Sequence, residues 1–168
     1  MGDHTETFQI DFDPTIISYM DLLQLFWQSH NPKRKAWSRQ YRAIILYQNE
    51  IQHEQALQSM TQVKSALNAP VTTDILPLVK FYLAEEYHQK YRLQSTPLME
   101  EMRIAYPNNQ EWIHSTATAR LNGYLSGYGL AETFSVDVTQ LGLSGSGESI
   151  LVKSVGMLGA PLTCPLPR

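Results

Sequence analysis

The feature that most constrains the fold of this 168-residue chain is the segment 41–47, which reads Tyr-Arg-Ala-Ile-Ile-Leu-Tyr. Residues 43–46 are apolar at successive positions, so an extended strand made from them has apolar side chains on both faces. Such a strand is buried only when other elements cover both of its sides. Strand-like and helix-like segments alternate along the chain, which predicts an α/β or α+β sandwich with helices packed on a small sheet.

Two periodic segments precede this strand. Residues 7–12 alternate between apolar and polar side chains, which predicts a strand with one buried face. Residues 19–27 are apolar at helical spacing and predict an amphipathic helix. Ser18 and Asp21 form a capping-box pattern at its start. Because the first strand begins so close to Met1, we expect it to need a neighbour, as if the chain began inside a domain.

Further elements are predicted after residue 48. A helix begins at Asn49 and ends before Pro70, and a β-branched strand follows over residues 71–76. Further helices are predicted over residues 84–93, 97–105 and 111–125. The buried stripe of the helix after Asn49 is expected at Leu57, Met60, Val63 and Leu67. The apolar face of the last helix is expected at Ile113, Ala117, Leu121, Tyr124 and Tyr128, with Gly127 or Gly129 ending it.

The composition changes after Gly129. Residues 141–147 are rich in glycine and serine, and residues 161–168 contain three prolines. This composition is typical of chain with little order of its own. The predicted organisation is therefore one domain over residues 1–129, followed by a flexible tail over residues 130–168.

Charge and cysteine content exclude several classes of protein. Thirteen Lys and Arg residues against sixteen Asp and Glu residues give a net charge of −3, so nucleic-acid binding is not expected. The four cations of residues 33–39 are interpreted as a solvated connection. The single cysteine, Cys164, rules out a disulfide within these residues and a multi-cysteine zinc site. No apolar stretch is long enough for a membrane span and no signal peptide is recognised, so we expect a cytoplasmic protein.

Five segments resemble, in order, the conserved blocks of the methionine sulfoxide reductase A family. Residues 2–6 are similar to its G-H-x-E block, and residues 12–32 to its D-P…S-Y-x-x-L-L-x-x-F-W-x-x-H-x-P run. Residues 40–44 resemble its Q-Y-R-S-x-I strand and residues 72–75 its T-T-E-I. Residues 81–89 resemble F-Y-x-A-E-x-Y-H-Q, and weaker similarity continues to Gly129.

The resemblance implies a peptide-methionine (S)-S-oxide reductase. In this chemistry a thiolate attacks the sulfoxide sulfur while an acid protonates the oxygen, and a second thiol or thioredoxin then reduces the resulting sulfenic acid. Glu6 matches the family's proton donor, a role that requires burial among apolar neighbours. Tyr41 matches the tyrosine that donates a hydrogen bond to the sulfoxide oxygen. Considered alone, Glu6 would be an exposed carboxylate and Tyr41 a core aromatic residue.

The departures from the family pattern concern the nucleophile. The family's Gly-Cys-Phe-Trp motif precedes the G-H-x-E block and does not occur here, and the usual G-N-D-x-G-T before Q-Y-R is replaced by residues 35–39. The implied fold is a ferredoxin-like βα sandwich that lacks its first strand and helix. Without the thiolate we expect weak or no reductase activity. Cys164 is expected to be a resolving or incidental thiol, because a replacement nucleophile must be held in attack geometry.

The sequence is also compatible with two other functional interpretations. The chain could be a non-catalytic module that binds methionine sulfoxide near Glu6 and Tyr41, or an unstable remnant. The family implies no bound cofactor, methionine sulfoxide in peptides or proteins as substrate, and thioredoxin or a dithiol as reductant. No metal, nucleic acid or membrane partner is expected, and the chain is expected to be a monomer. Glu85 and Glu86 with His88 are interpreted as helix-dipole partners in preference to a metal cluster.

Overall fold

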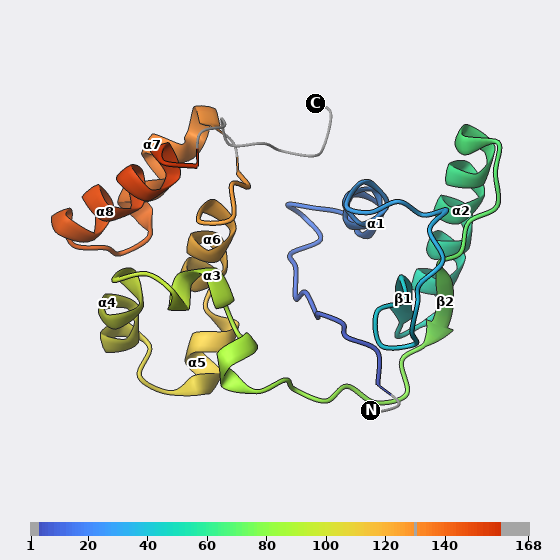
Figure 1. The fold of residues 1–168 in the computed structure, drawn as a ribbon, viewed down its shortest axis with the longest axis horizontal. Coiled ribbons are helices and arrows are strands. Elements are labelled where there is room, and N and C mark those ends of the chain that lie inside the picture. Colours follow the sequence, from blue (N-terminus) through green and yellow to red (C-terminus); the bar gives the residue numbers. More distant parts are fainter. Residues whose placement is uncertain (1–3, 130, 159–168) are drawn as a thin grey trace. The chain divides into compact units, whose positions relative to one another are not determined.

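A computed structural model describes residues 4–129 and 131–158 of the chain. These residues form two compact units, one over residues 4–81 and one over residues 82–158 (Figure 1). Each unit has its own hydrophobic core. The sequence predicted a single domain over residues 1–129, so the division after Phe81 was not anticipated. Within the described residues, no helix is both long enough and apolar enough to cross a membrane.

The first unit is built around a β–α–β element. Helix α1 (Tyr19–Gln28) precedes strand β1 (Ile44–Tyr47), and helix α2 (Glu50–Leu67) connects β1 to strand β2 (Asp74–Pro77). The two strands are parallel, with Ile44 opposite Asp74 and Tyr47 opposite Pro77. A parallel pair requires such a crossover connection. This mixture of helices and a small sheet is an α+β arrangement, as predicted.

The core of the first unit lies between the two helices and one face of the sheet. Leu23 and Trp27 of α1, Ile45 of β1 and Ala56 of α2 are buried together. The α1 start matches the sequence pattern: the Ser18 hydroxyl accepts a hydrogen bond from the Asp21 amide at 3.1 Å, and the Asp21 carboxylate accepts one from the Ser18 amide at 3.0 Å. This reciprocal cap confirms the predicted helix start.

One sequence-based prediction in the first unit was wrong, and a second is confirmed only in part. Residues 7–12 form no strand, and Phe8 is 77% exposed, because no strand among the described residues pairs with them. Alternation defines a face, but a strand also needs a partner for its backbone groups. In α2 the buried positions are Ala56 and Ser59, whereas Leu57 and Leu67 are exposed. Met60 and Val63 of the predicted stripe do pack against the core, so the stripe is confirmed in part. The helix is rotated so that Ala56 and Ser59 are its most buried positions, and Ser59 faces the Trp27 indole.

The second unit contains only helices in its described part. They are a 3₁₀ turn over Glu86–His88 and the helices α3 (Tyr91–Gln94), α4 (Leu98–Ala105), α5 (Asn109–His114), α6 (Thr116–Tyr124), α7 (Ala131–Gln140) and α8 (Gly145–Gly156). The helix predicted over 84–93 is interrupted at Lys90, whose φ is +53°. The helix predicted over 111–125 breaks at Ser115, whose hydroxyl accepts from the Thr118 amide and caps α6.

Helices α7 and α8 occupy much of the segment that the composition predicted to be a flexible tail. Val138, Leu141, Leu151 and Val155 from this segment are buried in the core of the second unit. The glycine- and serine-rich sequence that suggested disorder supplies the start of α8, where the Ser144 hydroxyl accepts a hydrogen bond from the Gly147 amide. Residues 159–168, which include Cys164, lie outside the described residues.

A carboxylate joins α7 to α6. Asp137 accepts hydrogen bonds from the Tyr124 hydroxyl, from Arg120 at 3.1 Å and from the Thr133 hydroxyl at 3.1 Å. The hydrogen bond from Tyr124 lowers the pKa of Asp137 below its ordinary value of 3.8. Burial and the neighbouring Asp137 raise the pKa of Tyr124 to about 12. The lowered pKa of Asp137 favours the folded unit above acidic pH. The raised pKa of Tyr124 favours it until the pH becomes strongly alkaline.

Replacing Asp137 with Asn should therefore destabilise the second unit in a pH-dependent way. At neutral pH the loss should be about 1–3 kcal/mol, because the Tyr124 hydroxyl and Arg120 lose a charged acceptor. The pKa of Asp137 is lowered by folding, so its contribution is fully present above pH 3.8 and disappears as the pH falls further. Urea unfolding of both proteins across this range measures the difference. A difference that stays constant on acidification would contradict this account.

A second prediction concerns the start of α8. The Glu101 carboxylate of α4 accepts a hydrogen bond from the Ser144 amide and occupies the space that a Cβ atom on Gly147 would take. Gly147→Ala should displace the Glu101 carboxylate and so remove its hydrogen bond with the Ser144 amide. A Cβ atom added at Gly145 has no other atom within 4 Å. We expect the Gly147 variant to be less stable than the Gly145 variant by about 1 kcal/mol.

Chemical denaturation of the two alanine variants tests this expectation, with Glu101→Ala as the background control. Once Glu101 is absent, the three atoms nearest to the added methyl group are gone, and the two substitutions should have similar effects. If the gap between them persists in that background, Glu101 is not its cause.

Candidate active site

The segment around Glu6 lies against the segment around Tyr41. The Glu6 amide donates to the Gln40 carbonyl at 2.9 Å, and the Gln40 side-chain amide donates to Glu6 Oε1 at 2.7 Å. One residue earlier, the Thr5 hydroxyl donates to the Arg39 carbonyl and accepts from Arg42 Nε, both at 3.1 Å. Four hydrogen bonds thus join two of the sequence blocks, which are 34 or more residues apart.

Arg42 extends this junction to a third block. Its Nη1 nitrogen lies 2.9 Å from Oδ2 of Asp74, the first residue of β2. The Arg42 side chain is 25% exposed and that of Asp74 47% exposed, so solvent screens the pair and its net contribution to stability is small. The ion pair matters for geometry, because it fixes the direction of the Arg42 side chain, which also binds the Thr5 hydroxyl.

Tyr41 is half exposed and lies against another aromatic ring. Its ring centroid is 4.9 Å from that of Trp37, with 32° between the ring planes, and Trp37 is 74% exposed. No hydrogen bond joins Tyr41 to Glu6 within the part of the chain that the structure describes. The two predicted site residues are therefore brought into one region through Gln40, without a direct bond between their functional groups.

An apolar cavity of about 440 Å³ adjoins Glu6. Residues 6–12 form one wall, the Leu22–Phe26 side of α1 another, and β1 a third. Arg42, Gln48 and Gln52 supply polar groups to the lining. Glu6 itself is exposed, so the burial that a proton donor requires is not present in the protein alone.

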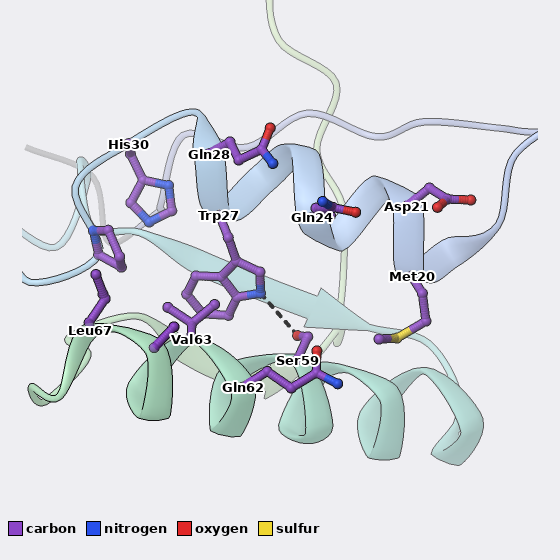
Figure 2. Close-up of a pocket in the computed structure, with 12 residues that line it drawn as sticks. Met20, Asp21, Gln24, Trp27, Gln28, His30, Ser59, Gln62, Val63 and Leu67 are labelled. Carbon is purple, nitrogen blue, oxygen red and sulfur yellow. Dashed lines mark hydrogen bonds between the residues drawn. The ribbon is translucent and has the colours of Figure 1, made fainter. Parts of the chain in front are cut away.

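A larger cavity of about 640 Å³ lies between α1 and α2, and neither Glu6 nor Tyr41 lines it. Figure 2 shows the Trp27 indole pointing from α1 toward α2, where its Nε1 donates to the Ser59 hydroxyl at 3.0 Å. His30 lies at one end of this cavity, and its Nδ1 contacts the Phe26 carbonyl at 2.8 Å. These contacts are those of helix packing, and the cavity brings no pair of catalytic groups together.

The other residues considered from the sequence do not form a site. His88 Nε2 and Glu85 Oε2 are 3.9 Å apart and both side chains are exposed. In the described residues, no group of three or more His, Cys, Asp or Glu side chains could hold a metal ion. Cys164 lies outside the described residues.

The sequence did not reveal the roles of Thr5 and Arg42. Both lie in the blocks that suggested the family, but nothing in their spacing indicated that a threonine hydroxyl would bridge Arg39 and Arg42. The Trp37–Tyr41 ring pair was also missed. Its only signal was the position of Trp37 four residues before Tyr41, in a segment that departs from the family pattern.

Comparison with known proteins identifies the class to which this arrangement belongs. Residues 1–120 match the family model described as peptide methionine sulfoxide reductase. The chain therefore belongs to the peptide methionine sulfoxide reductase family, and the sequence resemblance is confirmed.

Individual relatives agree with this assignment. A peptide methionine sulfoxide reductase of Drosophila melanogaster is 40% identical over 147 residues, which cover 86% of this chain and 58% of that protein. Peptide methionine sulfoxide reductase A5 of Arabidopsis thaliana is 36% identical, over 74% of this chain and 51% of that protein. The MsrA protein of Methanosarcina acetivorans is 40% identical, over 52% and 50% respectively. The chain spans about half the length of the curated relatives it matches.

The contact between Trp27 and Ser59 can be tested by stability measurements. Ser59→Ala leaves the indole N–H of a tryptophan that is 7% exposed without an acceptor, so we expect the first unit to lose about 1–3 kcal/mol. Ser65→Ala, on an exposed turn of the same helix, is the matched control and should change stability by less than about 0.5 kcal/mol. Equal losses in thermal or urea unfolding would contradict a specific role of this hydrogen bond, because alanine has the higher helix propensity and that change alone favours the helix at both positions.

Proposed function

We propose that this chain carries the acid and tyrosine part of a peptide-methionine (S)-S-oxide reductase site. Glu6 is the proton donor and Tyr41 the hydrogen-bond donor to the sulfoxide oxygen. The observation that most supports this proposal is the set of four hydrogen bonds between residues 5–6 and 39–42, which brings the two blocks into one region beside an apolar cavity. The membership of the family supports the choice of substrate.

The proposed reaction divides the chemistry between a thiolate and these two residues. The thiolate forms a bond to the sulfoxide sulfur while Glu6 gives a proton to the oxygen, and the sulfur–oxygen bond of the substrate then breaks with release of hydroxide. Attack of this hydroxide on the cysteine sulfur breaks the new sulfur–sulfur bond, so that the oxygen ends on the cysteine. The products are methionine and a cysteine sulfenic acid, which a second thiol converts to a disulfide with release of water. Substrate bound over the cavity would cover Glu6 and supply the apolar surroundings that its role requires.

The 168 residues contain one cysteine, Cys164, and no Gly-Cys-Phe-Trp motif. We therefore propose that these residues alone have weak or no reductase activity, with Cys164 as a resolving-type thiol. We also propose that the chain is monomeric and cytoplasmic and has the βα sandwich of its family. Its reductant would be thioredoxin or another dithiol, and no bound cofactor takes part.

A second candidate function is binding of methionine sulfoxide without chemistry. The cavity and the junction of residues 5–6 with 39–42 favour it, because neither depends on a cysteine. In this case the protein would bind an oxidised methionine and release it unchanged.

Turnover and binding measurements on the full chain separate these possibilities. With dithiothreitol and a peptide that carries methionine S-sulfoxide, we expect no methionine above the amount formed without protein, both for the chain and for Cys164→Ser. In calorimetric titration, Tyr41→Phe should weaken sulfoxide binding by a factor of about 2–10, the value of one hydrogen bond. Tyr91→Phe, which removes the hydroxyl of another exposed tyrosine, in the second unit, is the control.

Each result bears on a different part of the proposal. Robust turnover by Cys164→Ser would refute the account of the nucleophile. Binding that Tyr41→Phe leaves unchanged would refute the role of the tyrosine. No affinity for the sulfoxide at all would refute both candidate functions.

A further inference from the structure

The loop that leads into Tyr41 carries an uncompensated cluster of positive charge. Lys33, Arg34, Lys35 and Arg39 are all exposed, and none forms an ion pair within the described residues. Over the whole sequence acidic residues exceed basic ones, with a net charge of −3, so this loop is a local reversal of sign. Unpaired like charges held close together repel one another, and an anionic partner relieves that repulsion.

The backbone of this loop is held in place at both ends. At its start, the Thr72 amide donates to the Pro32 carbonyl at 2.9 Å, and the Thr72 hydroxyl donates to the Arg34 carbonyl at 3.0 Å. At its end, the Thr5 hydroxyl donates to the Arg39 carbonyl. The sequence suggested a solvated connection, but these anchors give the four cations a fixed support.

An exposed aromatic surface lies within the same loop. Trp37 is 74% exposed and its ring lies against that of Tyr41, which is 49% exposed. An exposed tryptophan flanked by cations combines apolar contact area with charge, a composition typical of a recognition surface. Since Tyr41 belongs to the proposed active site, this surface is continuous with that site.

We propose that residues 33–41, the Trp37 loop, bind the acidic segment of a peptide whose oxidised methionine enters the site at Glu6 and Tyr41. The lysines and arginines attract Asp and Glu residues that flank the methionine, and the Trp37 ring contacts apolar parts of the same peptide. This inference rests on the proposed function and specifies its substrate as methionine sulfoxide in an acidic context.

A peptide fits this surface better than a nucleic acid. Four cations on one short loop of an acidic chain are a small electrostatic footprint, whereas nucleic-acid binding relies on many phosphate contacts. The carboxylates of Glu6 and Asp74 lie at the same junction and would repel a continuous line of phosphates. A peptide can place its carboxylates at the loop and its neutral sulfoxide at Glu6.

Four fluorescent peptides of one length test the proposal on the full chain by anisotropy. They contain a central methionine or methionine sulfoxide, flanked either by Asp and Glu or by Asn and Gln. At low salt we expect the acidic peptides to bind about tenfold more tightly than the neutral ones, with the difference shrinking at high salt. The double variant Lys33→Gln/Lys35→Gln should reduce this preference for acidic peptides several-fold. The charge-matched control, Lys64→Gln/Lys153→Gln, removes two exposed lysines elsewhere and should leave it unchanged.

Trp37→Ala should weaken the binding of acidic and neutral peptides alike, because it removes apolar contact and no charge. Equal binding of acidic and neutral peptides would overturn the proposal. So would an equal effect of the control pair, or displacement of the peptide by a single-stranded oligonucleotide at a lower concentration than by an unlabelled acidic peptide. Equal binding of oxidised and unoxidised peptides would instead contradict the proposed function, and it is measured independently of the acidic preference.

Discussion

The hydrogen bonds between residues 5–6 and 39–42 are the contact on which the position of residues 4–12, and with it the candidate site, depends. Residues 4–12 have no strand partner among the described residues, so this junction holds them against the remainder of the unit. Arg42 connects the junction to β2, because one guanidinium contacts both Thr5 and Asp74. If it were lost, the wall that residues 6–12 give to the apolar cavity would also be lost.

Local patterns predicted the elements whose determinants lie within a few residues of each other. The cap of α1 requires only Ser18 and Asp21, and the strand at 44–47 follows from a continuous apolar run. The sequence could not indicate that Phe8 would be exposed, because that depends on whether another strand is available. The rotation of α2 escaped prediction for a similar reason, since the neighbour of Ser59 is 32 residues away.

The candidate site, too, was predictable from the sequence only in part. Glu6 and Tyr41 could be located by comparison with family blocks, and the structure brings these blocks together. Their surroundings could not be found in this way, because the Trp37 loop is the part where the chain departs from the family pattern. In the second unit, a glycine- and serine-rich sequence predicted disorder, yet a carboxylate from another helix turns that sequence into a helix start. Composition cannot reveal a partner that comes from 43 residues away.

The distribution of the three tryptophans has a spectroscopic consequence. Trp27 is 7% exposed in the first unit and Trp112 is 1% exposed in the second, whereas Trp37 is 74% exposed. Each unit thus contains a single shielded fluorophore, and the surface loop contains the single accessible one. Iodide, an anion attracted by the surrounding lysines and arginines, should quench Trp37 selectively and leave the two shielded emitters as separate indicators of the folding of each unit.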